Sequence, residues 1–428
     1  MLRVFFALTL LAALSWLGLF NRQQEITWSK DELARIQSLV LPAPAVLAKS
    51  VVHTGNQYWD NPLAITLGKQ LFFDKALSGN GQVACATCHL PQAGFADPQP
   101  FSRGIGVTKR HSPALLGVAS SAWFFWDGRA DSLWAQALGP LEDPAEQGAN
   151  RLQLAKLIQS KYALQYQNIF GPLADFSALP NNATPATNNV KWQQTWQSLP
   201  LADQTNINRV FANIGKSIAA FESKLLPSTT KFDRFATELL ATGESDLLSR
   251  QEKQGLKTFI NDQTGQCMRC HNGAYFTNND FQVTGIKDTF TPLGTGRAEG
   301  IQKALNSEFS CAGVYADIDD KNSQCQELKF AKRIGSELEF AFKVPSLRNV
   351  AQTAPYMHNA SLETLEEVLH FYTRAVSQYT NEESNKTDQQ KIHLDIEPLA
   401  LASNQLLQLA AFLRTLNSET KAALKPEL

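Results

Sequence analysis

The stretches CATCH (residues 85–89) and CMRCH (residues 267–271) decide the fold of this chain, because each is a complete attachment motif for a c-type haem. Two thiols three positions apart can each bond a haem vinyl group, and the histidine that follows can bind the iron as its proximal ligand. A redox dithiol needs no histidine after its second cysteine, and a zinc site needs its two cysteine pairs much closer together. We therefore predict two covalently bound haem c groups. The residues that hold them are Cys85, Cys88 and His89 in the first motif and Cys267, Cys270 and His271 in the second.

The length and charge of the chain indicate two domains and argue against a nucleic acid partner. A chain of 428 residues exceeds what one hydrophobic core usually serves, and each half holds one haem motif. The formal net charge is −1, so no surface for nucleic acid is expected. We expect a first haem domain over residues 55–235 and a second over residues 245–420.

The first 22 residues have the pattern of an export segment. Arg3 is followed by an apolar run from Val4 to Phe20. Two outcomes stay open: a cleaved signal peptide, or an N-terminal membrane anchor, since the run has about the minimum length for a span. In either case the body of the protein is predicted to lie in the periplasm, where haem attachment and disulfides are expected.

Cysteine counting predicts one disulfide. Four of the six cysteines belong to the haem motifs, which leaves Cys311 and Cys325 in a polar, loop-rich segment. In an oxidising compartment these two should pair, and closing a loop of that size would contribute about 3 kcal/mol in the chain-entropy model. The alternative is a pair of free buried thiols.

Hydrophobic periodicity predicts a mainly α fold with long irregular loops, because strand signals are short throughout. Thr364 and Glu367 form a capping box that should start one helix. Further helices are expected at 61–77, 152–169, 206–226, 249–260 and 403–416. Loop is expected mainly at 90–113, 176–190 and 276–342.

The chain resembles the bacterial dihaem cytochrome c peroxidase and MauG superfamily. The resemblance runs in order over roughly residues 60 to 420. It is carried by the two haem motifs and by LGKQLFFD (67–74), RHSPALLGV (110–118), FWDGRADSLWAQALGP (125–140), PSLRN (345–349) and TAPYMH (353–358). It implies two cytochrome c-like helical domains with one haem on either side of their interface. The N-terminal haem would meet peroxide, and the C-terminal haem would handle electrons.

The resemblance also implies roles for single residues. His89 and His271 would be the proximal iron ligands, and Trp126 would lie between the haems and relay electrons. Glu146 would move a proton during cleavage of the peroxide O–O bond, and Gln136 would hydrogen-bond the bound oxygen or water. Each has a plainer alternative. Trp126 would be a core residue with a satisfied indole N–H, and Glu146 a solvated surface carboxylate.

Two departures from the family pattern bear on the first haem and on a calcium ion. In family peroxidases that need prior reduction, a histidine that follows the first haem motif blocks the iron until activation. Residues 90–110 contain neither histidine nor methionine, and the nearest match to the blocking position is Arg103, which stays protonated and cannot bind iron, so the first iron should be open at rest. The family's calcium ion takes carbonyl oxygens that match Thr353 and Pro355, but His111 stands where an asparagine is expected. Calcium prefers oxygen ligands, so the presence of this ion stays open.

The distal ligand of the second haem separates the branches of the superfamily. In the peroxidases a methionine occupies the position of Tyr372, whereas MauG has a tyrosine there. Tyr372 therefore resembles the MauG-like members, and a phenolate ligand would favour oxidised iron where a thioether favours reduced iron. The alternatives are Met357, with His358 and His370 as weaker candidates, or a Tyr372 that is only a buried aromatic.

The resemblance implies a MauG-like peroxidase that reduces hydrogen peroxide. Its electrons would come from a small redox protein, a cytochrome c or a cupredoxin, or from side chains of a protein substrate. The alternative is a dihaem electron-transfer cytochrome without peroxide chemistry. An open first haem with Glu146 beside it distinguishes the two, because pure carriers usually fill both axial positions.

Overall fold

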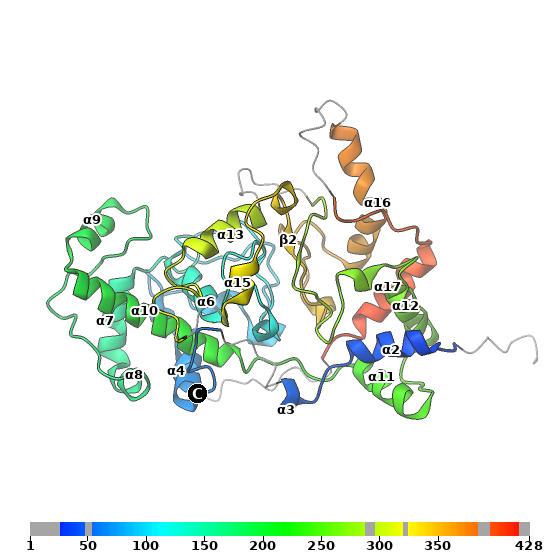
Figure 1. The fold of residues 1–428 in the computed structure, drawn as a ribbon, viewed down its shortest axis with the longest axis horizontal. Helices are drawn as coiled ribbons and strands as arrows, with labels where there is room; N and C mark the ends of the chain where they lie inside the picture. Colours follow the sequence, from blue (N-terminus) through cyan, green and yellow to red (C-terminus); the bar gives the residue numbers. More distant parts are fainter. Residues whose placement is uncertain (1–25, 48–53, 287–295, 320–323, 384–393, 419–428) are drawn as a thin grey trace, which may run out of the picture.

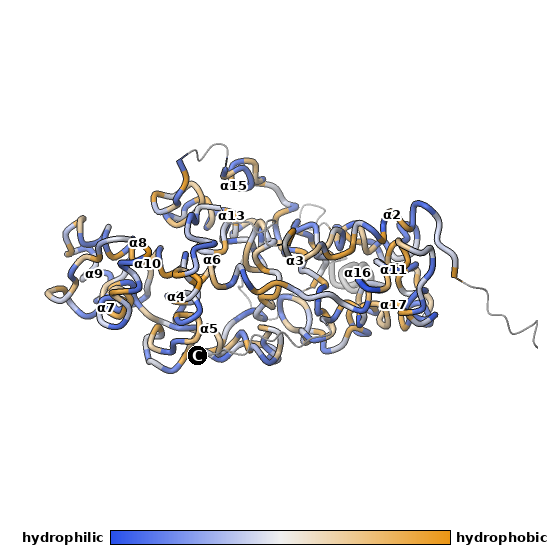
Figure 2. Tube along the Cα trace, turned by 90° about the horizontal axis from the view of Figure 1, so that it is seen from below, coloured by the Kyte–Doolittle hydropathy of each residue, from blue (hydrophilic) through white to orange (hydrophobic). Residues whose placement is uncertain are grey.

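The computed structural model describes residues 26–47, 54–286, 296–319, 324–383 and 394–418, and shows an elongated, mainly helical molecule (Figure 1). The predicted export segment lies outside these ranges. Hydrophobic and hydrophilic stretches alternate along the helices of both halves (Figure 2). Within the described ranges, no helix has both the length and the apolar character needed to cross a membrane.

The N-terminal half is built around the long helix α10 (Leu201–Glu222). Its residues from Ile207 to the end are buried, apart from Arg209. Helices α4 and α6 pack on it closely. A Cβ atom at Gly68 or Gly215 would collide with the backbone of the facing helix, so both positions need glycine. The helices of this half are α4 (Pro62–Phe73), α5 (Cys85–Cys88), α6 (Leu133–Glu142), α7 (Arg151–Lys161), α8 (Ala163–Phe170), α9 (Val190–Ser198) and α10.

The C-terminal half pairs helix α12 with helix α17 and covers them with α2 and α11 at one end of the molecule (Figure 1). Its helices are α2 (Lys30–Leu39), α3 (Pro44–Leu47), α11 (Lys231–Thr242), α12 (Arg250–Ile260), α13 (Arg297–Asn306), α15 (Gln326–Phe330), α16 (Leu365–Glu383) and α17 (Ser403–Arg414). Strands β1 (Phe281–Gln282) and β2 (Phe342–Lys343) form a small antiparallel pair. Short 3₁₀ turns occur at η1 (Lys75–Leu77), η2 (Pro91–Ala93), η3 (Val118–Ser120), η4 (Cys267–Arg269), η5 (Ser336–Leu338) and η6 (Val350–Gln352).

The two halves have separate hydrophobic cores, but their chain segments are exchanged. Helix α2 precedes the first half in sequence, yet Ile36 and Leu39 pack in the second core. Conversely, Phe309 comes from the second half and packs in the first core, edge-on against Trp134 and Phe211. Each lobe is therefore completed by a segment that lies far away in the sequence.

The break between the two cores lies earlier than the sequence boundaries placed it. Leu225 is the last residue of the continuous first half that packs in the first core. Phe232 and Phe235, which the sequence analysis assigned to the end of the first domain, belong to the second core through helix α11. Helix α11 packs against α2. Because α2 lies far away in the sequence, the local sequence could not predict this contact.

The predicted helices occur, and their ends follow capping chemistry. Helix α12 starts after Ser249, whose capping box with Glu252 is formed, and α16 starts after the box of Thr364 and Glu367. The expected helix at 152–169 is divided at Tyr162 into α7 and α8. The expected helix at 206–226 starts earlier, at Leu201, and ends at Glu222. The mainly α fold class is confirmed.

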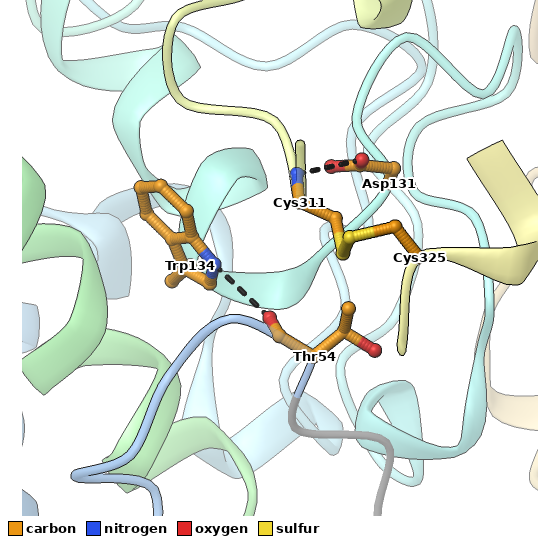
Figure 3. The surroundings of a disulfide bond; sticks show 5 residues. All are labelled: Thr54, Asp131, Trp134, Cys311 and Cys325. Atoms are coloured by element: carbon orange, nitrogen blue, oxygen red, sulfur yellow. Dashed lines mark hydrogen bonds between the residues drawn. A yellow bond between two sulfur atoms is a disulfide. The ribbon is translucent and has the colours of Figure 1, made fainter. Parts of the chain in front are cut away.

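The predicted disulfide between Cys311 and Cys325 is present, with a Cα–Cα distance of 5.7 Å (Figure 3). It fixes a loop of the second half against the first. The carboxylate of Asp131 accepts a hydrogen bond from the backbone N–H of Cys311 at 2.8 Å, and Trp134 beside it donates its indole N–H to the carbonyl of Thr54 at 3.1 Å. The disulfide therefore closes a loop from the second half of the sequence that lies against the first lobe.

Three hydrogen bonds, each accepted by a backbone carbonyl, join the WDGR segment and His111 to the second half. The N–H of Lys343 donates to the carbonyl of Trp126 at 2.8 Å, and the N–H of His111 donates to the carbonyl of His358 at 2.9 Å. The Arg297 guanidinium donates to the carbonyl of Gly128 at 2.7 Å. The segment around Trp126 thus lies at the interface of the two halves.

Candidate dihaem redox site

The first CxxCH motif is one helical turn followed by a buried histidine. The N–H of His89 donates to the carbonyl of Cys85 at 2.9 Å, and the Thr87 hydroxyl caps the turn by accepting from Ala84 N–H at 2.9 Å. Burial lowers the pKa of His89 to about 4. The imidazole is therefore neutral at pH 7, which is the form that binds iron.

The second motif, formed by η4 and the two residues after it, orients its histidine more tightly. His271 Nδ1 lies 3.0 Å from the carbonyl oxygen of Phe276, and burial lowers the pKa of the ring. With the proton of the neutral imidazole assigned to Nδ1, this contact is an N–H donor bond that leaves Nε2 with its lone pair available. Hydrogen bonds of this kind hold a metal-binding histidine in one orientation.

The four motif cysteines are not joined to one another. Burial raises the pKa of Cys85 and Cys267 to about 12 and that of Cys88 to about 11. Each motif thus offers two free thiols for the haem vinyl groups and one histidine for the iron. The donor sets of both motifs therefore fit haem c.

The end of helix α6 and the turn after it lie beside the first motif. Gln147 donates from Nε2 to the sulfur of Cys85 over 3.6 Å, and the charge of Glu146 acts on the Cys88 thiol. On α6 itself, the buried Oε1 of Gln136 has no hydrogen-bond partner in the part of the chain that the structure describes. The structure thus places Glu146 beside the first motif, whereas the role of Gln136 on α6 stays a prediction.

The carboxyl group of Glu146 has a pKa close to neutral pH. Burial, with a smaller contribution from Asp143, raises the pKa of Glu146 to about 7, and the positive charge of Arg129 opposes this rise. Arg129 is held by Asp127 at 3.1 Å and stacks on the ring of Phe125 at 3.5 Å. The sequence analysis did not single out Gln147 or Arg129, although Arg129 stands in the quoted WDGR segment.

The loop over residues 90–110 covers the backbone of the Glu146 turn. Ile105 N–H donates to the Glu146 carbonyl at 2.8 Å, and Gly106 N–H donates to the Ala145 carbonyl at 2.9 Å. Gly104 lies so close to this backbone that a Cβ atom would collide with it. Arg103, the nearest match to the blocking position, is exposed at the base of the small turn that Val107 closes.

Trp126 lies between the two halves. Its indole N–H donates to the carbonyl of His111 at 2.8 Å, and its ring packs edge-on against the His358 ring, with 6.3 Å between centroids. The indole N–H is satisfied, as the plainer alternative required. The position at the lobe interface is what distinguishes this tryptophan from the core tryptophan Trp134.

The residues matched to a calcium ion do not fit one. His111 is buried, its Nδ1 lies 3.1 Å from the carbonyl oxygen of Gln99 and 3.3 Å from that of Pro100, and the Thr353 backbone is a further hydrogen-bond partner of the ring. The His111 N–H therefore bonds carbonyl groups of residues 99 and 100, and its ring supplies no oxygen ligand for a calcium ion. Thr353, adjoining the Ala354-Pro355 bond, faces a ring nitrogen where the family pattern has oxygen.

Tyr372 on helix α16 faces the second motif. Burial raises the pKa of its phenol, and the Cys270 and Cys267 thiols raise it further, which places all three groups in one region. The alternatives lie elsewhere: Met357 stands at a φ of 71° in a turn, and His358 stacks on Phe342 with 3.7 Å between ring centroids. The weaker alternative His370 is exposed.

Two CxxCH motifs in one mainly helical chain, one beside an acid and an amide and the other facing a tyrosine, define a dihaem c-type redox enzyme. The family model described as "Di-haem cytochrome c peroxidase" matches residues 62–239. The methylamine utilization protein MauG of Methylorubrum extorquens is 28% identical over 377 residues, which cover 86% of this chain and 83% of that protein. The cytochrome c551 peroxidase of Nitrosomonas europaea is 27% identical, covering 76% of each.

A solved structure agrees at the level of the fold. The dihaem peroxidase BthA from Burkholderia thailandensis superposes with a TM-score of 0.60 at 21% identity, covering 84% of this chain and 87% of that one. Over most of its length the chain is therefore similar to MauG proteins and dihaem cytochrome c peroxidases. It carries two covalently bound haem c groups at the two motifs.

Proposed function

We propose that this protein is a MauG-like peroxidase facing the periplasm, which reduces hydrogen peroxide at the first haem site. The observation that carries the proposal is Glu146, a carboxyl group with a pKa of about 7 beside the first motif, together with the unpartnered Gln136 amide. An electron-transfer cytochrome needs neither a proton-transfer group nor an open hydrogen-bond acceptor at this site. The relatives named MauG and cytochrome-c peroxidase support the same class.

Reduction of hydrogen peroxide to two water molecules takes two electrons and two protons. When bound, the haems supply the electron transfer. Glu146 takes the proton from the inner oxygen of peroxide and returns it to the outer oxygen, which leaves as water. A group with a pKa near 7 suits both steps, because at neutral pH neither its protonation nor its deprotonation costs much free energy.

Gln136 and the covering loop do the remaining work at the first site. The free Oε1 of Gln136 accepts a hydrogen bond from peroxide or water, so the amide orients the substrate next to Glu146. The turn at residues 103–107 donates one hydrogen bond to the Glu146 carbonyl and one to the Ala145 carbonyl, and so holds the backbone that carries the Glu146 side chain. Neither element carries a histidine or methionine that would have to move before peroxide enters.

Trp126 connects the two sites, and Tyr372 adapts the second one to oxidised states. The indole lies on the interface with its N–H and backbone carbonyl both bonded, so the ring is fixed for electron transfer. A phenolate from Tyr372 at the second site favours the oxidised form. Electrons then come from a small redox protein, a cytochrome c or a cupredoxin, or from side chains of a protein substrate.

The test is to mix the fully oxidised holoprotein with hydrogen peroxide in a stopped-flow spectrometer, with no reductant present. We expect an immediate spectral change, because nothing blocks the first site, and a resting spin-resonance spectrum with one high-spin and one low-spin haem. Two low-spin haems, or a reaction only after half-reduction, would contradict the proposal. If the protein exchanges electrons but does not react with peroxide, the alternative of an electron-transfer cytochrome would be favoured.

A further inference from the structure

Lys343 places a positive charge at the interface of the two lobes. It is the second residue of β2, its backbone N–H donates to the Trp126 carbonyl at 2.8 Å, and it pairs across the small sheet with Phe281. Its side chain is partly buried, and the surrounding protein lowers the pKa of its amine to about 8. A charged amine in such a place is unfavourable unless an anion accompanies it.

The nearby carboxylates are already engaged. Asp127 binds Arg110 at 2.8 Å and Arg129 at 3.1 Å. The side chain of Asp280 accepts from the N–H of Phe281 at 2.8 Å. Across the described ranges of the chain, no carboxylate forms an ion pair with Lys343, and burial is the sole cause of its pKa shift.

The strand that holds Lys343 runs past the second haem motif. Thr277 donates its hydroxyl to the carbonyl of Val344 at 2.7 Å, and Asn278, next in the chain, donates its N–H to the carbonyl of Cys270 at 2.9 Å. The backbone of Pro345 is a hydrogen-bond partner of the His271 ring. Lys343 therefore stands two residues from the segment that supports the second proximal histidine, on the side that faces Trp126.

Each haem c carries two carboxylates, which are the anions this region would receive. Arg297 is the other buried cation here, and it is bonded to the Gly128 carbonyl and packed on Trp123 and Phe281. We propose that the Lys343 amine forms an ion pair with a carboxylate of the second haem. It is a positioning residue, because it acts on the iron only through the haem carboxylate.

This ion pair would set the electron affinity of the second haem relative to the first. Neutralising a negative carboxylate makes it easier to add an electron to the same haem, so the pair raises the midpoint potential of that haem. Tyr372 acts in the opposite direction from the other side. The inference goes beyond the peroxidase activity, since it concerns the equilibrium between the haems and not the reaction with peroxide.

The test is a spectroelectrochemical titration of both haems in the holoprotein, without peroxide. Lys343→Gln should lower the midpoint of the second haem and leave the first nearly unmoved. Lys343→Arg should keep the wild-type value, because the charge is retained. Lys191→Gln, an exposed lysine at the start of α9 at the far end of the first lobe, removes the same charge elsewhere and should change neither midpoint (Figure 1).

A second measurement separates the ion pair from a folding defect. Mass spectrometry should show two haems in every variant, and resonance Raman spectra should show a changed carboxylate bending band in Lys343→Gln alone. An unchanged second midpoint in Lys343→Gln, or a shift confined to the first haem, would overturn the assignment. Because no peroxide is used, these outcomes are independent of whether the proposed peroxidase activity is found.

Discussion

The two CxxCH motifs of this protein share their spacing but not their surroundings. The first is followed by a covering loop and lies beside Glu146, whose pKa is about 7, and beside the free Gln136 amide. The second holds His271 on the Phe276 carbonyl and faces Tyr372, a phenol whose pKa is raised by burial. In the proposed function, the first site moves protons and the second fills both axial positions of its iron. The motif therefore fixes the cofactor, and the side chains around it fix the role.

The largest effect should come from removing the proton carrier of the first site. Glu146→Gln keeps the size of the side chain but cannot accept a proton, so the reaction of the oxidised protein with peroxide should slow by about a hundredfold or more. Stopped-flow absorbance measures the rate. Glu244→Gln, a change at an exposed glutamate between α11 and α12, is the matched control and should react like the wild type. A Glu146→Gln rate within a few-fold of the wild-type rate would remove the distinction between the sites.

Changing Tyr372 should affect the second site alone. Tyr372→Met replaces a phenol by a thioether, which favours reduced iron, so the midpoint potential of the second haem should rise. Redox titration followed by absorbance would show this, with the low-spin signal of the second haem altered in spin resonance. The initial rate with peroxide should stay near the wild-type value. If the midpoint and the low-spin signal both stay unchanged, Tyr372 is only a buried aromatic.

A smaller effect concerns the pH at which Glu146 changes its charge. Its pKa is raised by burial and by Asp143 and is opposed by Arg129. The carboxylate form accepts the proton of peroxide, so the rate should rise with pH through about 7. Asp143→Asn should move this midpoint to lower pH, and Arg129→Gln should move it to higher pH. Rate profiles for the three proteins would check the signs, and a shift of both variants in one direction would contradict the assignment.

The smallest expected effect is that of calcium removal. Because the His111 ring already bonds the carbonyls of Gln99 and Pro100 and the Thr353 backbone, and supplies no oxygen ligand of its own, a calcium chelator should leave the spectrum and the thermal unfolding temperature of the holoprotein unchanged. His111→Asn frees these carbonyls and adds an amide oxygen, so this variant should gain a calcium-dependent unfolding temperature. Stoichiometric calcium in the purified wild-type protein, measured by elemental analysis, would refute this reading.

The sequence predicted the parts of the site that depend on local spacing. The haem motifs, the Cys311–Cys325 pair and the helix that carries Tyr372 all follow from residues close together in the chain. The exchange of segments between the lobes could not be found in this way, because α2 and Phe309 pack against residues far away in the sequence. Lys343 was not predicted for a similar reason, because its role depends on which carboxylates the fold brings near it.

Local patterns also failed where tertiary contacts decide the geometry. Nothing in the Leu90–Pro113 stretch signals that the 103–107 turn bonds to the backbone of the Glu146 turn. The raised pKa of Glu146 follows from that covering, so an isolated glutamate in an acidic stretch looked like a surface residue. A sequence signal existed only in the resemblance to the family.

The exchanged segments also have a consequence for biogenesis. The first lobe binds its haem at residues 85–89, but its core lacks Phe309 until more than two hundred further residues have been synthesised. The second core likewise needs helix α2, which leaves the ribosome first and must wait for its partners. Each core therefore includes a segment from a distant part of the sequence, and we expect both to close only when nearly all of the chain is present.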